Sequence, residues 1–108
     1  MSTYLETLVR KTASMVDRWQ GRRARMLELT RSHPTLRIVI GDDTYGKNLL
    51  IACLDPLYVC GPVRWESSAI ALEPLQLDSG EQGIAVVDKD HGVRVVGASC
   101  EVKETVKW

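Results

Sequence analysis

The stretch MSTYLETLVRKTASMVDRWQGRRARMLELTRSH, residues 1–33, decides the fold that the sequence predicts. Its apolar side chains recur at the seven-residue spacing of an amphipathic helix, which differs from the two-residue period of a strand. Thr3 and Glu6 have the spacing of a capping box that begins a helix, and Pro34 follows the last residue. The two rows of the repeat are Leu5, Thr12, Trp19, Met26 and Leu8, Met15, Arg22, Leu29.

One continuous helix is the expected form of this stretch. Gly21 costs about 1 kcal/mol inside a helix, but the repeat keeps its phase across this residue, from Trp19 to Met26. A helix of about thirty residues is roughly 45 Å long, which exceeds the reach of the strand region that follows it. The excess length predicts that a second surface covers the helix, and we therefore expect a homo-oligomer, most simply a dimer.

Charge is divided unevenly between this helix and the rest of the chain. Residues 1–33 carry seven Lys/Arg and three Asp/Glu, a net charge of +4, whereas residues 34–108 carry seven and eleven, a net charge of −4. Lys11, Arg18 and Arg25 form a basic row beside the apolar stripe, and a coiled coil of two such helices offers this row no acid. We expect the row to dock on the acidic strand region of its own or a neighbouring chain; the alternative is a solvated face, because a surface ion pair is worth only ~0–1 kcal/mol. The residues predicted to bind the partner are Leu8, Met15, Arg18, Trp19, Arg22, Arg25 and Met26.

The rest of the chain has the apolar runs and turn residues of β-strands. Its connections are short, which predicts an antiparallel meander. Gly97 is expected to bend or bulge the last strand. The sequence thus predicts a single α+β domain over residues 1–108, with the helix packed on a five- to six-stranded antiparallel sheet, either open or curved into a partial barrel. The expected strands cover residues 35–40, 48–54, 57–60, 65–77, 84–87 and 93–106.

The segment Gly41–Asn48 has the GxxxxGK spacing of a phosphate-binding loop. Asn48 replaces the Ser or Thr whose hydroxyl would hold magnesium, and Asp42 and Asp43 bring negative charge to the position of the phosphates. The residues after Lys47 read as a strand, so no helix N-terminus points at the anion. We interpret this segment as a hairpin loop.

The cysteines and histidines do not have the spacing of a metal or catalytic site. Cys53, Cys60 and Cys100 contain no CxxC pair, and we expect all three to be buried, reduced thiols within strands. The segment 88–92 contains polar side chains that suit a hairpin tip. His33 and His91 are the only histidines, and no nucleophile stands at a diagnostic spacing from either. We predict no catalytic residue, no metal and no cofactor.

Three hypotheses for function remain. The leading one is a non-enzymatic homo-oligomeric interaction module, with an unknown protein as a further partner. The second is a small-molecule-binding or catalytic protein with a pocket between helix and sheet. The third is nucleic-acid binding through the helix arginines, which a net charge of zero and a pI near 6.7 make unlikely. Aromatic residues that could line the pocket are Trp19, Tyr45, Tyr58 and Trp65.

The sequence also predicts the cellular location of the protein. No apolar run approaches the ~18–20 residues of a membrane span. The first residues become charged at Glu6 and contain no apolar signal core. We therefore expect a cytoplasmic protein without a membrane partner.

Overall fold

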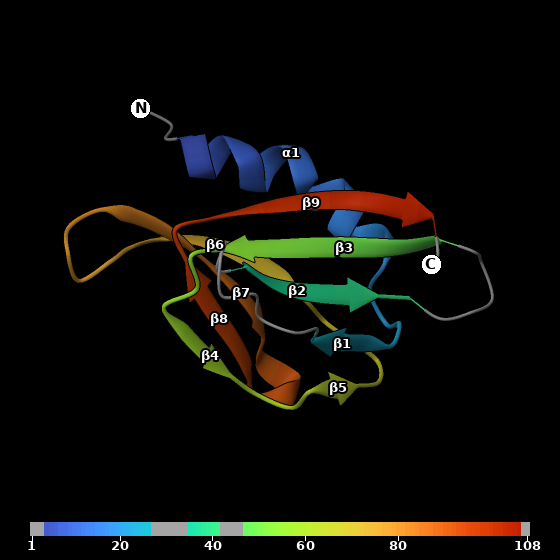
Figure 1. Cartoon of the computed structure of the whole chain (residues 1–108). Coiled ribbons are helices and arrows are strands. Elements are labelled where there is room, and N and C mark those ends of the chain that lie inside the picture. Colours follow the sequence, from blue (N-terminus) through green and yellow to red (C-terminus); the bar gives the residue numbers. More distant parts are fainter. Residues whose placement is uncertain (1–3, 27–34, 42–46, 107–108) are drawn as a thin grey trace.

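The computed structural model describes residues 4–26, 35–41 and 47–106. Within these ranges the chain forms an α-helix, α1 (Tyr4–Arg18), a 3-10 helix, η1 (Lys89–His91), and nine strands in two antiparallel sheets (Figure 1). The expectation of an α+β fold with antiparallel strands is therefore confirmed. None of the described helices has the length and apolar character that crossing a membrane requires.

Helix α1 ends at Arg18, and the prediction of one helix over residues 1–33 is wrong beyond that point. Gly21 has a φ of 80°, a left-handed conformation that glycine adopts without strain, and its N–H donates to the carbonyl of Ser68 at 2.7 Å. The chain then enters strand β1 (Ala24–Met26). The seven-residue repeat continues across Gly21 because α1 and β1 both face the same core. Residues 27–33 lie outside the described residues.

The first sheet has five strands, and β2 and β3 form its centre. Leu36, Ile38 and Ile40 alternate inward along β2, as predicted, and all three are buried. β3 pairs with β2 on one side and with β9, from the other end of the chain, on the other. In order across the sheet the strands are β5 (Arg64–Trp65), β1, β2 (Thr35–Ile40), β3 (Lys47–Leu54) and β9 (Ser99–Val106).

The second sheet has four strands, so the prediction of a single sheet is wrong. The predicted meander is wrong as well, because β3 pairs with β9 and not with the next strand along the chain. The expected strand over residues 65–77 divides into β5 and β6, and Ser67 between them has a φ of 52°. The described strands form two separate sheets and do not close a barrel. In order across the second sheet the strands are β4 (Tyr58–Cys60), β8 (Val93–Gly97), β7 (Gln82–Asp88) and β6 (Ala71–Gln76).

The main core lies between the two sheets and helix α1. The helix packs on β6, β7 and β9, so it covers one open side of the pair of sheets (Figure 1). Val16 and Trp19 bring the apolar stripe of the helix region into this core. The stripe is therefore buried, in large part, against the sheets of its own chain. The fully buried aliphatic residues include Ile38, Ile40, Leu49, Ile51, Ile84, Val86 and Val95.

Two chain segments cross from one sheet to the other at the same corner. One runs from β3 to β4 and the other from β8 to β9. The two are joined by hydrogen bonds from Ala98 N to Leu54 O, at 3.0 Å, and from Leu57 N to Val96 O, at 2.7 Å. Gly97 lies at the predicted bend, but β8 ends there and β9 continues in the other sheet, so the expected single strand over residues 93–106 is two strands. A Cβ atom on Gly97 would stand only 2.7 Å from the Leu54 carbonyl oxygen. The corner therefore requires glycine because the second backbone passes too close for any side chain.

We predict that Gly97→Ala destabilises the protein by about 2–3 kcal/mol, because the backbones at the corner must move apart. Gly80→Ala is the matched control. Its Cβ meets no atom within 4 Å, so it carries only the cost of its φ of 90°, about 1–2 kcal/mol. Urea unfolding measures both free energies. A Gly97→Ala variant no less stable than Gly80→Ala would contradict the steric account of the corner.

Candidate functional site

The apolar residues of the predicted partner surface lie against the core of their own chain. Trp19 is 8% exposed. Leu8, Met15 and Met26 are partly buried and pack on the same core cluster. Their binding to a second protein stays a prediction, but much of their apolar surface is already covered.

The three arginines of the predicted partner surface have different surroundings: Arg18 and Arg22 lie near Trp19, and Arg25 lies on β1. Arg18 donates to the Glu104 carboxylate at 2.8 Å, and the indole N–H of Trp19 donates to the same oxygen at 3.2 Å. The guanidinium of Arg22 lies over the Trp19 ring, 4.9 Å from its centroid. The contact of Arg18 with Glu104 is the expected docking of a helix base on the acidic strand region. Arg25 instead lies on β1, exposed.

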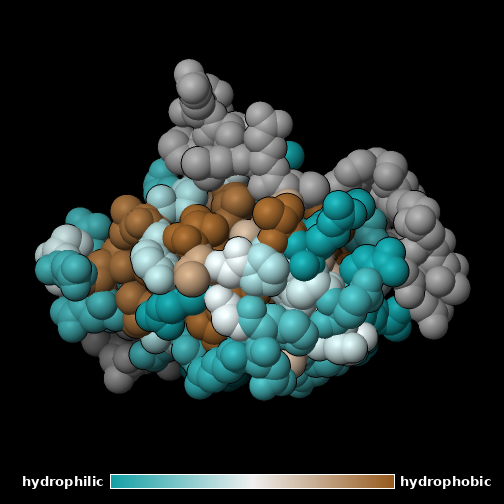
Figure 2. All heavy atoms as spheres, turned by 90° about the horizontal axis from the view of Figure 1, so that it is seen from below, coloured by the Kyte–Doolittle hydropathy of each residue, from teal (hydrophilic) through white to brown (hydrophobic). Residues whose placement is uncertain are grey.

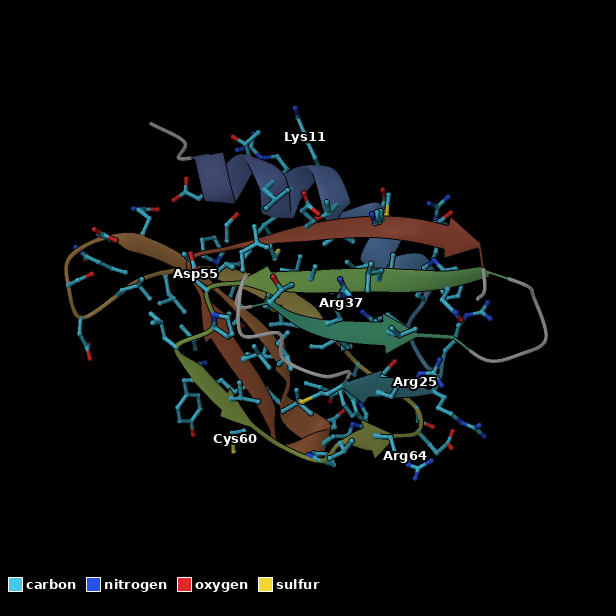
Figure 3. All side chains as sticks on the ribbon, in the orientation of Figure 1. Lys11, Arg25, Arg37, Asp55, Cys60 and Arg64 are labelled. Carbon is cyan, nitrogen blue, oxygen red and sulfur yellow. The ribbon has the colours of Figure 1, made fainter. Side chains whose placement is uncertain are left out.

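The surroundings of Arg25 differ from those of Arg18 in the sign of the neighbouring charge. Arg25 is directly opposite Arg64 of β5 in the antiparallel register, and both side chains are exposed (Figure 3). Like charges directly opposite across two strands destabilise their pairing. Arg23, which with Arg18, Arg22 and Arg25 makes up the arginines considered for nucleic-acid binding, is paired with Glu66 at 2.9 Å. The helix arginines therefore do not form one continuous basic face.

We predict opposite effects for charge reversal at these two arginines. Arg18→Glu places an acid beside Glu104 and should destabilise the protein by about 1 kcal/mol, since the pair is largely exposed. Arg25→Glu removes the repulsion from Arg64 and should be neutral or stabilising by up to ~0.5 kcal/mol. Urea unfolding midpoints at low salt compare the two variants. Equal destabilisation by both would contradict this assignment of partners.

Asp88 is the centre of a buried polar cluster that the sequence did not indicate. Its carboxylate has no exposed surface and accepts from the Trp65 indole N–H at 2.8 Å, the Ala69 N–H at 2.8 Å and His91 Nδ1 at 2.9 Å. Burial raises the pKa of Asp88, but the hydrogen bonds from Ala69, His91 and Trp65 outweigh it and leave the pKa below its ordinary 3.8. The cluster ties the hairpin tip to residues 65–69.

We predict that Asp88 makes the stability of the fold depend on pH. A carboxyl whose pKa is lowered by folding adds stability above its unfolded pKa, and this stability is lost as the pH falls through the folded pKa. The free energy of unfolding should therefore fall as the pH drops below about 4, and less steeply in Asp88→Asn. The comparison uses urea unfolding at pH 7, 4 and 3. Parallel pH profiles for wild type and Asp88→Asn would argue against an ionised Asp88.

The cysteines differ in exposure. Cys53 and Cys100 are buried opposite each other on β3 and β9, and burial raises their pKa values to about 12 and about 11. Cys60 is exposed, which corrects the prediction that all three are buried. The neighbouring Cys60 thiol raises the pKa of Tyr58 above its ordinary 10.0. Cys60 is thus the one accessible thiol of the chain.

The remaining predicted motifs carry no site in the described residues. Lys47 begins β3 and Asn48 is buried within it, as expected for a hairpin, while residues 42–46 lie outside the described ranges. No group of three or more His, Cys, Asp or Glu in the described part of the chain is placed to hold a metal ion. The hollow between α1 and β6 measures about 140 Å³, below the ~300–1,000 Å³ of typical ligand sites.

Eight consecutive exposed residues form the outer edge of both sheets. This edge segment, residues 57–64, contains β4, the last strand of the four-stranded sheet, and reaches β5, the last strand of the five-stranded one. Its large apolar side chains are far more exposed than is usual for their type. Figure 2 views the underside of the molecule and shows brown hydrophobic patches there. The exposed fractions of the four large apolar side chains in the edge segment are 67% for Leu57, 52% for Tyr58, 48% for Val59 and 70% for Val63.

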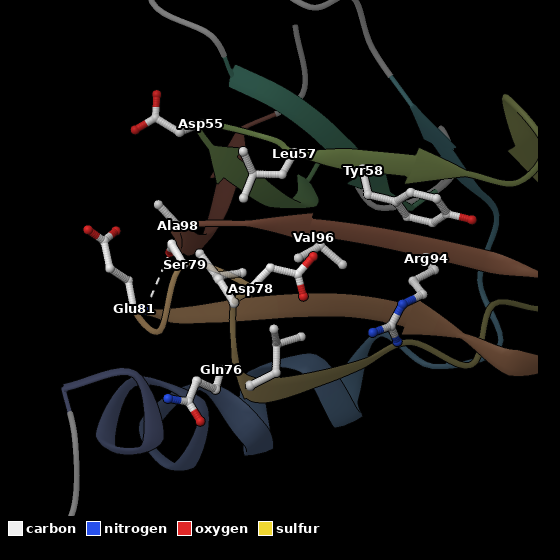
Figure 4. Close-up of a pocket in the computed structure, with 12 residues that line it drawn as sticks. Asp55, Leu57, Tyr58, Gln76, Asp78, Ser79, Glu81, Arg94, Val96 and Ala98 are labelled. Atoms are coloured by element: carbon white, nitrogen blue, oxygen red, sulfur yellow. Dashed lines mark hydrogen bonds between the residues drawn. The ribbon is translucent and has the colours of Figure 1, made fainter.

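An open groove lies beside the edge segment, on the outer face of the four-stranded sheet (Figure 4). Its volume is about 810 Å³. The turn at residues 77–81 forms one wall, where Leu77 N donates to Glu81 O at 2.7 Å, and the corner between the sheets forms one end. Beneath it lies a small second core of Ala85, Val87 and Val96, on which Leu75 and Leu77 pack.

Sequence reasoning missed both surfaces. The sequence predicted a strand at residues 57–60, but its pattern of apolar residues does not show whether a strand lies at the edge or in the centre of a sheet. The one available signal was Pro62, a residue that natural sheets place at exposed edges. Comparison of the chain with protein-family models, curated proteins and solved structures finds no match.

Proposed function

We propose that this protein is a non-enzymatic interaction module that forms a homodimer through the edge segment, residues 57–64. The observation that carries the proposal is the run of eight exposed residues with four large apolar side chains on the edges of both sheets. Exposed apolar edge strands pair with other strands unless they are protected. A patch of this kind marks an interaction site in a folded protein.

A second copy of the chain suits this edge because the segment complements itself. Two copies related by a two-fold axis pair their β4 strands antiparallel, with the same residues buried on both sides. Asp55 and Arg64 flank the apolar part of the segment at opposite ends (Figure 3). Antiparallel pairing brings Asp55 of one copy to the end that carries Arg64 of the other, so both charges find a partner.

The edge segment is a better dimer surface than the helix face for a physical reason. Trp19 and Val16 are buried in the chain's own core, whereas Leu57 and Val63 expose two-thirds or more of their area. Burying apolar area gains roughly 25 cal/mol per Å², so the larger gain is available at the edge. The homo-oligomer predicted from the helix is thus proposed here at a different surface.

A lysine at the centre of the edge tests the proposal. We predict a dimer at tens of micromolar for the wild type and a monomer for Val59→Lys, with the dissociation constant raised at least ten-fold. Ala71→Lys is the matched control, because Ala71 is an exposed residue on β6, the opposite edge of the same sheet. Light scattering coupled to size exclusion measures the mass. A wild-type monomer at this concentration would refute the proposal.

Cys60 provides a second test on the unmodified chain. Since it is the only exposed cysteine, a short bis-maleimide should join two wild-type chains into a covalent dimer when β4 strands pair. The yield should fall in Val59→Lys and vanish in Cys60→Ser. A dimer by mass that no short cross-linker captures would place the interface away from β4.

A further inference from the structure

The groove on the outer face of the four-stranded sheet combines an apolar floor with charges sorted along its length. Val96 and Ala98 of the β8–β9 segment lie in the floor, and Leu75 and Leu77 stand beside them. This floor is an apolar sheet face that no second layer of the described residues covers. The groove is therefore apolar enough to hold a ligand and open enough to admit a chain.

The rim of the groove is acidic at one end and basic at the other. Asp55 and Glu81 both lie toward the end formed by the corner, and Asp78 projects from the turn at residues 77–81 toward the middle (Figure 4). Arg94 lies at the opposite end, near Tyr58. With three carboxylates against one guanidinium, the groove attracts cations over most of its length and an anion at Arg94.

We propose that this groove binds a short extended peptide segment of another protein, with basic and apolar side chains in alternation. The apolar side chains lie on the floor over Val96, and the basic ones face Asp78 and Glu81. A carboxylate of the ligand, such as a chain end, lies toward Arg94. In an extended peptide successive side chains point to opposite sides, so one row of side chains meets the floor while the other meets the acidic rim.

The shape of the groove favours a peptide over a small molecule. Small-ligand sites bury most of the ligand's surface in a cleft or cavity, whereas this groove of about 810 Å³ is open to solvent and would leave a small ligand exposed. A chain segment lying across an open groove gains from several side chains at once. The groove shares Leu57 and Tyr58 with the edge segment, but the inference goes beyond the proposed dimer because Asp78, Glu81 and Arg94 lie outside that segment.

Fluorescence anisotropy tests the proposal with a labelled hexapeptide that alternates lysine and leucine and has a free C-terminal carboxylate. We expect saturable binding to the wild type and at least five-fold weaker binding to the double variant Asp78→Asn, Glu81→Gln. The matched control is Asp90→Asn, Glu101→Gln, which removes two exposed acids away from the groove. An equal loss in both double variants would show attraction to net charge only, and would overturn the proposal.

Two further measurements test the orientation and the independence of the site. Amidation of the peptide's carboxylate should weaken binding to the wild type at least two-fold and leave binding to Arg94→Gln unchanged. Val59 does not line the groove, so Val59→Lys should bind the peptide no more weakly than the wild type does. A peptide that alternates glutamate and leucine should bind at least ten-fold more weakly. Equal affinity for the acidic and basic peptides, or no saturable binding of the basic one, would refute the proposal.

Discussion

The close passage of two backbones at the corner between the sheets is the constraint on which the rest of the structure depends. Gly97 leaves room for the Leu54 carbonyl, so the β3–β4 segment and the β8–β9 segment turn together from one sheet into the other. Asp55 makes the turn at a φ of 51°, a conformation that aspartate tolerates better than most residues. The same corner sets β4 at the edge of its sheet and supplies one end of the groove, so both proposed surfaces depend on it.

Helix α1 and the Asp88 cluster fix the remaining elements around this frame. The helix places Trp19 in the core, and Glu104 of β9 satisfies both the indole and Arg18. On the other side, Asp88 binds the indole of Trp65, and Trp65 is the inward residue of the short strand β5. The two buried tryptophans thus each donate their indole N–H to a carboxylate, as buried tryptophans usually do. Through Trp65, a buried charge holds the end of the edge segment in place.

The sequence predicted the elements whose residues alternate or bend in a recognisable way. β2 and the kink at Gly97 have the predicted places, and the tip at Asp88–Gly92 joins β7 to β8 as expected. The long helix was mispredicted because a seven-residue spacing cannot distinguish one helix from a helix and a strand that face one core. The exposure of Leu57 and Cys60 could not be predicted, since it depends on which strands become neighbours. The groove charges likewise come together only through the corner and the turn at 77–81.

The pairing of β3 with β9 also governs how the chain folds. The two strands share an eight-residue register, yet all four strands of the second sheet lie between them in the sequence. Contacts between segments so distant along the chain form slowly, because a long loop must close first. Until β9 arrives, β3 presents an unpaired edge that includes the apolar run Leu49–Cys53. The folding of this protein should therefore be limited by the capture of its last strand, and the chain is most prone to aggregate in the interval before that capture.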